Sequence, residues 1–421
     1  MGDFIEFLYA RFLLSDGVSI DTRTIKKDNL FFAISGPNFN ANQFAEEALE
    51  KGAAYAVVDD ESYTTSEKII LVDDCLTALQ QLAVFHRDRF KRPVIGITGS
   101  NGKTTTKELI SKVLSEKYIV HATKGNYNNH IGVPLTLLHI HPQVEIAIIE
   151  MGANHVGEIA QLCSFSKPTH GLITNIGRAH TETFGGIEGV IRGKSELFDY
   201  LRKTESVSFI NMNDSVLSNM SKRFEAPIQY PQKDFKLLAS TPLLKVALNG
   251  IEKVTNVVGR YNYVNMAAAV AIGRFFEVPD ENILNALTSY EADNARSQII
   301  RKGSITIILD AYNANPDSMK AALDNLAEQN DSKLAILGDM NELENSDNQH
   351  AEVLEHARKL GINRVLTVGE KIGKVANPNQ HFESKDQLVA ELKKMDLSNS
   401  IVLLKASRSI KLESILNSIS E

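Results

Sequence analysis

The sequence has 421 residues, of which 43% are hydrophobic and 23% charged, and its formal net charge is −7. A chain of this length predicts two or three domains with sizeable cores. Acidic and basic residues are mixed along the chain rather than gathered into a basic run, which argues against a nucleic-acid-binding or membrane-surface protein.

Targeting signals and cysteine usage bear on the compartment. The acidic start, Met1-Gly2-Asp3-Phe4, lacks the basic and apolar segments of a signal peptide, and no apolar run is long enough to span a membrane. Cys75 and Cys163 are far apart and have no metal-ligand spacing, which is typical of buried, reduced thiols. We therefore expect a cytoplasmic protein without a transmembrane helix.

Short apolar runs alternate with amphipathic helical patterns along most of the chain, which is typical of an α/β protein. The runs are continuous rather than alternating, as expected for parallel strands that are buried on both faces. The predicted strands are residues 94–98, 146–150, 172–175, 305–310, 334–337, 365–368 and 401–404. The predicted helices are residues 76–89, 104–117 and 318–328.

The order of these elements divides the chain into three blocks. Residues 1–90 form a small α/β unit that ends in an amphipathic stretch and a Lys91-Arg92-Pro93 break. Residues 91–297 open with a strand, a glycine-rich loop and a helix, and residues 298–421 carry a further series of strands and helices. We expect three domains with these boundaries.

A glycine-rich loop, Gly99-Ser100-Asn101-Gly102, follows the strand at 94–98 and precedes Lys103, Thr104 and Thr105. Such a loop points successive N–H groups at one anion, and the helix N-terminus adds a positive dipole end. The match to G-x-x-x-x-G-K-T is imperfect because Ile97 stands in place of the first glycine. The alternative is a plain strand–helix turn. The position between strand and helix favours ATP or GTP binding, with Lys103 on the phosphates and Thr104 on Mg²⁺.

Three further residues follow buried strands or lie near them. Glu150 ends an apolar strand, where open α/β sheets bind ligands, and its carboxylate suits Mg²⁺ beside a triphosphate. His180 and Lys194 could equally be a structural histidine and a surface lysine, and spacing alone does not decide between the roles. The residues taken by themselves thus predict an α/β enzyme that uses Mg-ATP.

At this point the chain resembles the ATP-dependent Mur ligases, which form amide bonds in bacterial cell-wall synthesis. The motifs occur in the family order over nearly the whole chain. The family resemblance rests on residues 98–105, 175–180 and 259–262. Residues 123–129, 150–155, 310–319, 337–340 and 405–408 resemble the branch that joins D-alanyl-D-alanine to UDP-N-acetylmuramoyl-tripeptide. The alternatives are a sister Mur ligase, a folylpolyglutamate-type ligase or a non-catalytic nucleotide-binding protein.

The resemblance implies three domains: an N-terminal UDP-substrate domain, a central P-loop ATPase-type domain with a parallel sheet, and a C-terminal Rossmann-like domain. It implies that the tripeptide carboxylate takes the γ-phosphoryl group of ATP, and that the amine of D-alanyl-D-alanine then attacks the acyl phosphate. Three substrates on three domains imply an open form that closes before chemistry, because water would hydrolyse the acyl phosphate. We expect a monomer.

The resemblance also assigns residues. It makes Lys103, Glu150, His180 and Lys194 catalytic, and it gives two Mg²⁺ ions to Thr104, Glu150, His180 and a CO₂-derived carbamate on Lys194. The ATP-binding set is Gly99, Ser100, Asn101, Gly102, Lys103, Thr104, Thr105, Asn262 (adenine), Arg296 (γ-phosphate) and Asp310 (ribose). The substrate-binding set is Ser19, Asp21 and Arg23 (uridine nucleotide), Asn126, Asn128, Asn129, Asn313, Asn315 and Arg408 (dipeptide carboxylate).

Several of these residues have simpler local roles as alternatives. Asn126, Asn128 and Asn129 could form Asx turns, and Asn315 is a plausible N-cap because a proline follows it. The chain also departs from the family pattern: Ala406 replaces a glycine, Tyr261 stands where histidine is common, and residues 290–298 lack a Gly-Arg pair.

Overall fold

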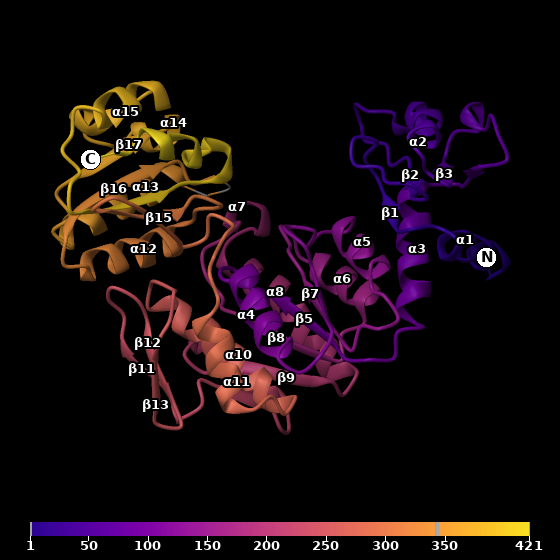
Figure 1. Ribbon diagram of the computed structural model, residues 1–421, viewed down its shortest axis with the longest axis horizontal. Helices are drawn as coiled ribbons and strands as arrows, with labels where there is room; N and C mark the ends of the chain where they lie inside the picture. Colours follow the sequence, from indigo (N-terminus) through magenta and orange to yellow (C-terminus); the bar gives the residue numbers. More distant parts are fainter. Residues whose placement is uncertain (1, 342, 344, 421) are drawn as a thin grey trace.

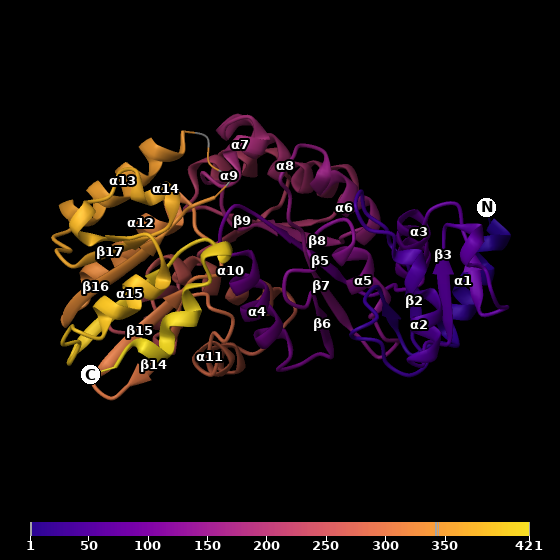
Figure 2. The ribbon, with the colours of Figure 1, turned by 90° about the horizontal axis from the view of Figure 1, so that it is seen from above.

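The computed structural model describes residues 2–341, 343 and 345–420, and these form an open crescent (Figure 1). The N-terminal and C-terminal regions are the two arms, and the central region joins them. A view from above shows the three regions in a row, with the N-terminal strands far from the C-terminal sheet (Figure 2). The crescent therefore keeps residues of the N-terminal arm apart from those of the C-terminal arm.

The N-terminal arm is a small parallel sheet covered by helices. Its strands lie in the order β1 (Val18–Ser19), β2 (Leu30–Phe32), β3 (Tyr55–Val58) and β4 (Ile69–Leu71). Its helices are α1 (Gly2–Leu13), α2 (Ala45–Glu50) and α3 (Cys75–Arg87). Helix α3 begins where Asp74 accepts a hydrogen bond from the Thr77 backbone N–H at 2.6 Å, and it buries Leu79 and Leu82.

The central region holds a six-stranded, all-parallel sheet in the order β10-β9-β8-β5-β7-β6. The chain moves to one side of β5 through β6 and β7, and then to the other side through β8, β9 and β10. The carboxyl end of β5 is therefore a switch point, where open α/β sheets form a ligand crevice. The strands are β5 (Val94–Thr98), β6 (Val120–Ala122), β7 (Ile146–Glu150), β8 (His170–Ile173), β9 (Val207–Asn211) and β10 (Ile228–Tyr230).

Helices cover both faces of this sheet. Helix α4 starts at the glycine-rich loop and buries an apolar stripe of Leu109, Ile110, Val113 and Leu114, which packs in one core with α10. The central helices are α4 (Lys103–Leu114), α5 (Gly132–Leu138), α6 (Glu158–Ser166), α7 (Thr181–Phe184), α8 (Ile187–Lys203), α9 (Ser215–Met220), α10 (Tyr261–Phe275) and α11 (Asp280–Thr288).

A small antiparallel sheet, which the sequence patterns did not predict, lies beside the central region. It consists of β11 (Phe235–Ala239), β12 (Lys245–Leu248) and β13 (Ile251–Val254). Every residue of β13 is exposed, and in β11 exposed residues alternate with one buried and two half-buried residues. Such strands lack the continuous apolar run by which the other strands were recognised.

The C-terminal arm is a six-stranded sheet in the order β14-β15-β19-β16-β17-β18, parallel except for the antiparallel edge strand β14. Its strands are β14 (Gln298–Lys302), β15 (Ile305–Asp310), β16 (Ser332–Gly338), β17 (Val365–Val368), β18 (His381–Phe382) and β19 (Ser400–Lys405). Its helices are α12 (Pro316–Glu328), α13 (Ser346–Lys359), α14 (Glu370–Gly373) and α15 (Lys385–Leu392).

The predicted elements agree closely with these bounds. Strands 94–98, 146–150, 305–310 and 365–368 match β5, β7, β15 and β17, while 334–337 and 401–404 lie inside β16 and β19. The strand at 172–175 is shifted, because β8 ends at Ile173 and the next two residues turn to bind the glycine-rich loop. The sheets fall within the three predicted blocks, whose exact boundaries stay a proposal.

Helix α12 contacts the central region at both of its ends. At its start, Asn315 and Asp317 bind the loops that follow β5 and β8. At its last residue, Glu328 accepts a hydrogen bond from the Ser240 hydroxyl at 2.6 Å and lies 3.7 Å from Arg260. In the described part of the chain, no helix combines the length and apolar character needed to cross a membrane.

Candidate active site

A cavity of about 700 Å³ lies where the central region meets the C-terminal arm. Loops that follow β5, β7, β8 and β15 line it, so it occupies the predicted crevice at the carboxyl ends of the strands. Most of the site residues predicted from the sequence line this cavity. They are Ser100, Asn101, Gly102, Lys103, Thr104, Thr105, Asn126, Asn128, Asn129, Glu150, His180, Asn262, Arg296, Asp310, Asn313 and Asn315.

The glycine-rich loop folds tightly at its two glycines. Gly99 has φ +144° and Gly102 has φ +76°, conformations that other residues rarely adopt. A Cβ atom on Gly99 would lie 2.0 Å from the Thr174 hydroxyl oxygen, and one on Gly102 would lie 2.8 Å from Asn265 Oδ1. Both positions therefore require glycine, for the close approach as well as for the backbone conformation.

The segment after β8 braces this loop. Asn175 accepts a hydrogen bond from the Ser100 backbone N–H through its carbonyl and another from the Asn101 N–H through its side chain, both at 3.0 Å. The Thr174 hydroxyl donates to the Asn101 carbonyl at 2.6 Å, and Ser100 exchanges two hydrogen bonds with the Gly177 backbone. These bonds fix the loop before any nucleotide binds.

Lys103, the first residue of α4, folds back over the loop. Its Nζ donates to the Gly99 carbonyl at 2.7 Å and to the Ser100 carbonyl at 3.3 Å. Burial lowers the pKa of Lys103 to about 8; the Glu150 carboxylate opposes this shift, and the Arg296 guanidinium adds to it. A negatively charged phosphate would raise this pKa again and stabilise the charged form of Lys103.

Glu150 is the last residue of β7, and its side chain is 1% exposed. Its Oε1 accepts hydrogen bonds from the Thr104 hydroxyl at 3.2 Å and from Asn128 Nδ2 at 2.9 Å. Its Oε2 is buried without a hydrogen bond from any described residue, and lies 3.9 Å from the buried Lys107 ammonium. A hydroxyl and a carboxylate with one oxygen that accepts no hydrogen bond form the hard donor set that Mg²⁺ prefers.

Lys194 lies on α8 and is 1% exposed. Its Nζ donates to the Ala153 carbonyl at 3.1 Å and lies 5.2 Å from the centroid of the Phe184 ring. Burial, followed by the nearby Lys103, holds the pKa of Lys194 well below that of an ordinary lysine. The buried position contradicts the alternative of a surface lysine, and it favours the neutral form of the amine.

His180 precedes α7 in the left-handed backbone conformation, with φ +55°. This strained position, rare for a non-glycine residue, places the histidine at the cavity wall rather than in the core. Within the described residues, no group of three or more His, Cys, Asp and Glu side chains gathers in metal-binding geometry.

The C-terminal wall of the cavity is braced internally. Strands β15 and β19 are parallel neighbours with Asp310 opposite Lys405, and Lys405 Nζ donates to Asp310 Oδ2 at 2.6 Å and to the Asn313 carbonyl at 3.2 Å. Asn315 caps α12: its side chain accepts from the Ser318 N–H at 2.9 Å, and its N–H donates to the Ser318 hydroxyl at 3.0 Å. The predicted N-cap role of Asn315 is confirmed.

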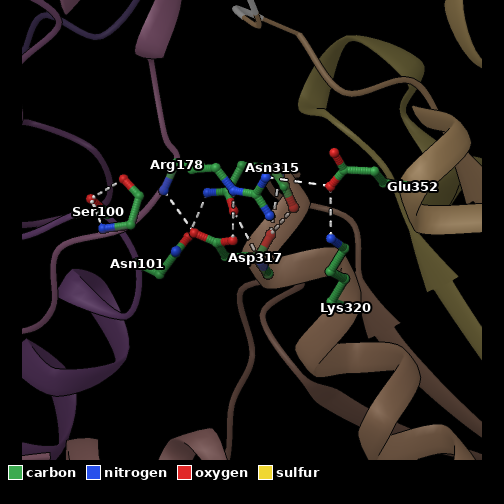
Figure 3. Close-up of polar contacts among 9 residues, drawn as sticks. Ser100, Asn101, Arg178, Asn315, Asp317, Lys320 and Glu352 are labelled. Carbon is green, nitrogen blue, oxygen red and sulfur yellow. Dashed lines mark hydrogen bonds and ion pairs between the residues drawn. The ribbon is translucent and has the colours of Figure 1, made fainter. Parts of the chain in front are cut away.

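The start of α12 also contacts the central wall, as Figure 3 shows. Asn315 Nδ2 donates to Asn101 Oδ1 at 2.6 Å. Asp317 accepts from the Arg178 backbone N–H at 2.7 Å and from its Nε at 3.2 Å. Arg178 Nη1 also lies 3.3 Å from Glu352, and Glu352 pairs with Lys320 at 2.9 Å. The C-terminal arm thus reaches both the glycine-rich loop and the segment that carries His180.

Asn262 lines the cavity, but its amide is already used within the protein. Its Nδ2 donates to the Val258 carbonyl at 2.8 Å, and its Oδ1 accepts from Asn265 Nδ2 at 2.8 Å. Nearby, the Tyr261 hydroxyl lies 2.7 Å from the Ser297 hydroxyl. Tyr261 therefore holds the segment between the central region and the C-terminal arm.

Six predicted site residues do not line the cavity. Gly99 begins the glycine-rich loop, and Lys194 is buried on α8. Arg408 pairs with Glu413 at 2.8 Å, and its Cζ lies 5.8 Å from the centroid of the Tyr312 ring. Ser19 lies in β1 of the N-terminal arm, and Asp21 and Arg23 follow in the next loop. The Arg23 guanidinium binds Asp21 and lowers the pKa of Asp21 to about 2. A substrate long enough to connect the N-terminal arm with the cavity would be needed to use them.

The asparagines after β6 take separate roles. Asn128 binds Glu150, as described above, whereas Asn129 Oδ1 accepts from the Ile131 and Gly132 N–H groups at 3.1 and 2.8 Å. Asn129 therefore makes the local turn considered as an alternative. The residues in or near the cavity that the sequence patterns missed include Lys107, Tyr312, Asp317 and Lys405. For Lys405 the available signal was its place at the end of a predicted strand.

Comparison with known proteins places the chain among relatives over almost its full length. Three family models match, described as Mur ligase family, catalytic domain (residues 15–87), Mur ligase middle domain (97–273) and Mur ligase, glutamate ligase domain (295–408). The chain is 35% identical to a UDP-N-acetylmuramoyl-tripeptide–D-alanyl-D-alanine ligase of Bacillus subtilis, over 96% of this chain and 93% of that protein. The ligase of the same name from Escherichia coli is 32% identical, over 96% and 94%.

Solved structures give the same result. The MurF structure from Acinetobacter baumannii superposes with a TM-score of 0.83 at 28% identity, covering 95% of this chain and 92% of that one. The MurF ligase of Thermotoga maritima in complex with ADP superposes with a TM-score of 0.83 at 25% identity, covering 97% of both chains. The predicted three-domain α/β architecture is confirmed by these matches.

Proposed function

The chain belongs to the Mur ligase family, and on that premise we propose that it joins D-alanyl-D-alanine to UDP-N-acetylmuramoyl-tripeptide with ATP as the energy source. The products are ADP, phosphate and the pentapeptide precursor of peptidoglycan, so the enzyme serves cell-wall biogenesis, cell shape and division. The observation that carries this function is the cavity itself. A glycine-rich phosphate loop and Glu150 form one wall, and the segment from Asp310 to Ser318 forms the other.

The chemistry of the reaction explains the residue types at this site. A carboxylate is a weak nucleophile, and a triphosphate repels it, so cations must neutralise the approach. Lys103 and the loop N–H groups would hold the β- and γ-phosphates, and Arg296 would contact the γ-phosphate from the far wall. Asp310 would bind the ribose. Asn262 would contact the adenine at the part of the cavity wall that it forms together with Asn265.

Mg²⁺ fits the residues present, because Thr104 and the Oε2 of Glu150, which accepts no hydrogen bond, supply hard oxygen donors. When bound, Mg²⁺ would neutralise phosphate charge and polarise the reacting oxygens. Glu150 and Thr104 would hold one ion, and His180 and Lys194 would support a second. Asn128 and Lys107 keep the Glu150 carboxylate in place at this position.

Lys194 supports the proposed carbamate through its environment. Its burial favours the neutral amine, and only a neutral amine adds to CO₂. The added carboxylate-like group would extend the reach of a lysine that itself does not line the cavity. The substrate would run from Ser19, Asp21 and Arg23 in the N-terminal arm, past Asn126 and Asn129, to the cavity. Asn313, Asn315 and Arg408 would receive the dipeptide.

The deciding experiment measures phosphate release with Mg-ATP, UDP-N-acetylmuramoyl-tripeptide and D-alanyl-D-alanine, with each omitted in turn. We expect release to require all three and the product to gain the mass of the dipeptide. Release with a single free amino acid in place of the dipeptide would instead identify a sister ligase or a folylpolyglutamate-type enzyme. Absence of release in every combination, at saturating bicarbonate, would indicate a nucleotide-binding protein without turnover.

We further propose that the enzyme works in the cytoplasm as a monomer. Its substrates are small molecules, and acidic and basic residues are mixed along the sequence rather than gathered into a basic run. Light scattering at micromolar concentration should give the mass of one chain, and a mass of two chains would contradict this.

A further inference from the structure

The segment between the central region and the C-terminal arm holds an arginine in a strained backbone. Ala295 and Ser297 both adopt the left-handed conformation, with φ +55° and +53°, and Arg296 lies between them. Such conformations cost free energy in residues other than glycine, so they persist where the surroundings hold them. The strain therefore indicates that the direction of the Arg296 side chain is fixed by its neighbours.

Three contacts hold this segment, and Tyr312 contributes one of them. The Tyr312 backbone N–H donates to the Ala295 carbonyl at 3.2 Å. Asp310 accepts from the Ser297 N–H at 3.3 Å, and the Tyr261 hydroxyl lies 2.7 Å from the Ser297 hydroxyl. Residues of both walls thus converge on the two neighbours of Arg296.

The Arg296 guanidinium rests on the face of the Tyr312 ring, with its Cζ 3.7 Å from the ring centroid. Its Nε is buried and makes no hydrogen bond with any described residue. Both residues line the cavity, and Arg296 is close enough to Lys103 to lower the pKa of that lysine. A ring face attracts a cation strongly when water is excluded, and it leaves the in-plane N–H groups free for an anion.

We propose that Tyr312 is a positioning residue that holds Arg296 in the direction needed to bind the γ-phosphate of ATP. This inference rests on the proposed function, since it concerns the phosphate contact of Arg296. Tyr312 acts through the arginine and touches no reacting atom itself. The ring face makes the contact, so phenylalanine should replace tyrosine, whereas an aliphatic side chain should not.

The test compares the binding of ADP with that of a non-hydrolysable ATP analogue, both with Mg²⁺, by calorimetry. The ratio of the two dissociation constants isolates the γ-phosphate contact, because the phosphate loop binds the rest of both nucleotides. We expect Arg296→Met to reduce the preference for the analogue about tenfold, and Tyr312→Leu to reduce it about fivefold. Tyr312→Phe should stay within about twofold of the wild type.

A double variant decides whether the ring acts through the arginine. Adding Tyr312→Leu to Arg296→Met should change the preference no further. A preference that is unchanged in Tyr312→Leu, or losses that multiply in the double variant, would overturn the proposal. Tyr118→Leu is the matched control, since the Tyr118 ring also lies near a cation, Lys117 at 5.3 Å, but outside the cavity.

Two further measurements distinguish a failure of this proposal from a folding defect in the variants and from a failure of the proposed function. Thermal unfolding of each variant identifies a folding defect, and Tyr312→Met replaces Tyr312→Leu if the leucine variant does not fold. If the wild type makes no product from the three substrates, the proposed function fails. The nucleotide preference still tests the role of Tyr312 in that case, because it needs binding alone.

Discussion

The two walls of the cavity are built in different ways. In the central wall, Thr174, Asn175 and Gly177 bind the phosphate loop, and Glu150 is held by Thr104 and Asn128, all within one region. The C-terminal wall is braced to itself through Lys405 and Asp310. Side-chain contacts made by Asn315, Asp317 and Glu352 join the C-terminal arm to the central wall. Nucleotide binding should therefore depend mainly on the central wall, and turnover on both.

The largest effect is expected from the central wall. Lys103→Ala removes the cation of the phosphate loop, and we expect kcat/KM to fall about 10²- to 10³-fold together with weaker ATP binding. Lys112→Ala, an exposed lysine of the same helix, is the control. If calorimetry shows that Lys103→Ala binds ATP as tightly as the wild type, nucleotide binding does not depend on the central wall as proposed.

The same lysine gives a pH dependence. Because the pKa of Lys103 in the empty site is about 8, its charge is present below pH 8 and is lost as the pH rises above it. We expect the affinity of the wild type for ATP to fall between pH 7.5 and about 9, as measured by titration calorimetry. Lys103→Ala should lack this dependence.

Lys194 should affect turnover without affecting nucleotide binding. We expect Lys194→Ala to lower kcat about 10²-fold or more while ADP binds as before. Since burial lowers the pKa of Lys194 and favours the neutral amine that adds CO₂, bicarbonate should raise the kcat of the wild type. Kinetics with bicarbonate, and with a short carboxylate added to the variant, provide the measurement. Unchanged turnover in Lys194→Ala would remove this lysine from the site.

The contact between the walls should have a moderate effect. Asp317→Ala removes the acceptor for the backbone and side chain of Arg178, and we expect kcat to fall about three- to tenfold because both groups are half-exposed. ADP binding should be unchanged. Arg358→Ala breaks an exposed ion pair with Glu355 in the same arm and serves as the control. A loss of ADP binding in Asp317→Ala would show that the walls are not independent.

The smallest effect concerns the stability of the central region alone. Burial lowers the pKa of His170 to about 4, so the unfolded chain binds its proton first as the pH falls. His170 therefore costs stability progressively from about pH 6.5 down to pH 4. We expect His170→Phe, which keeps the contacts with Phe275 and Phe276, to raise Tm by a few degrees at pH 5 and by less at pH 7. Equal shifts at both pH values would contradict this.

Continuous apolar runs were sufficient to predict the parallel strands, because burial on both faces leaves no polar position in them. The bounds of β5, β7, β15 and β17 follow directly. The exposed antiparallel strand β13 could not be recognised, since four exposed residues carry no hydrophobic period. Strand β8 was misplaced by two residues because Thr174 and Asn175, though they extend its pattern, serve the phosphate loop instead.

The candidate site was predictable where one short stretch of chain carries it. The phosphate loop is such a stretch, and Glu150 follows from its position at a strand end. The partners of these residues were not predictable, because they come from distant segments. Lys405 meets Asp310 through the register of two parallel strands, and Asp317 meets Arg178 through the packing of two regions. The assigned roles of the N-terminal residues Ser19, Asp21 and Arg23 stay predictions.

Helix α12 has a mechanical consequence. Its 13 residues form a stiff rod about 20 Å long, and its two ends rest on separate parts of the central region, at Asn101 and at Ser240. A rigid helix that is held at both ends cannot rotate about one contact while the other contact stays intact. Release of the C-terminal arm should therefore be a single concerted event with one rate, and a spectroscopic label at either end of the helix should record the same rate.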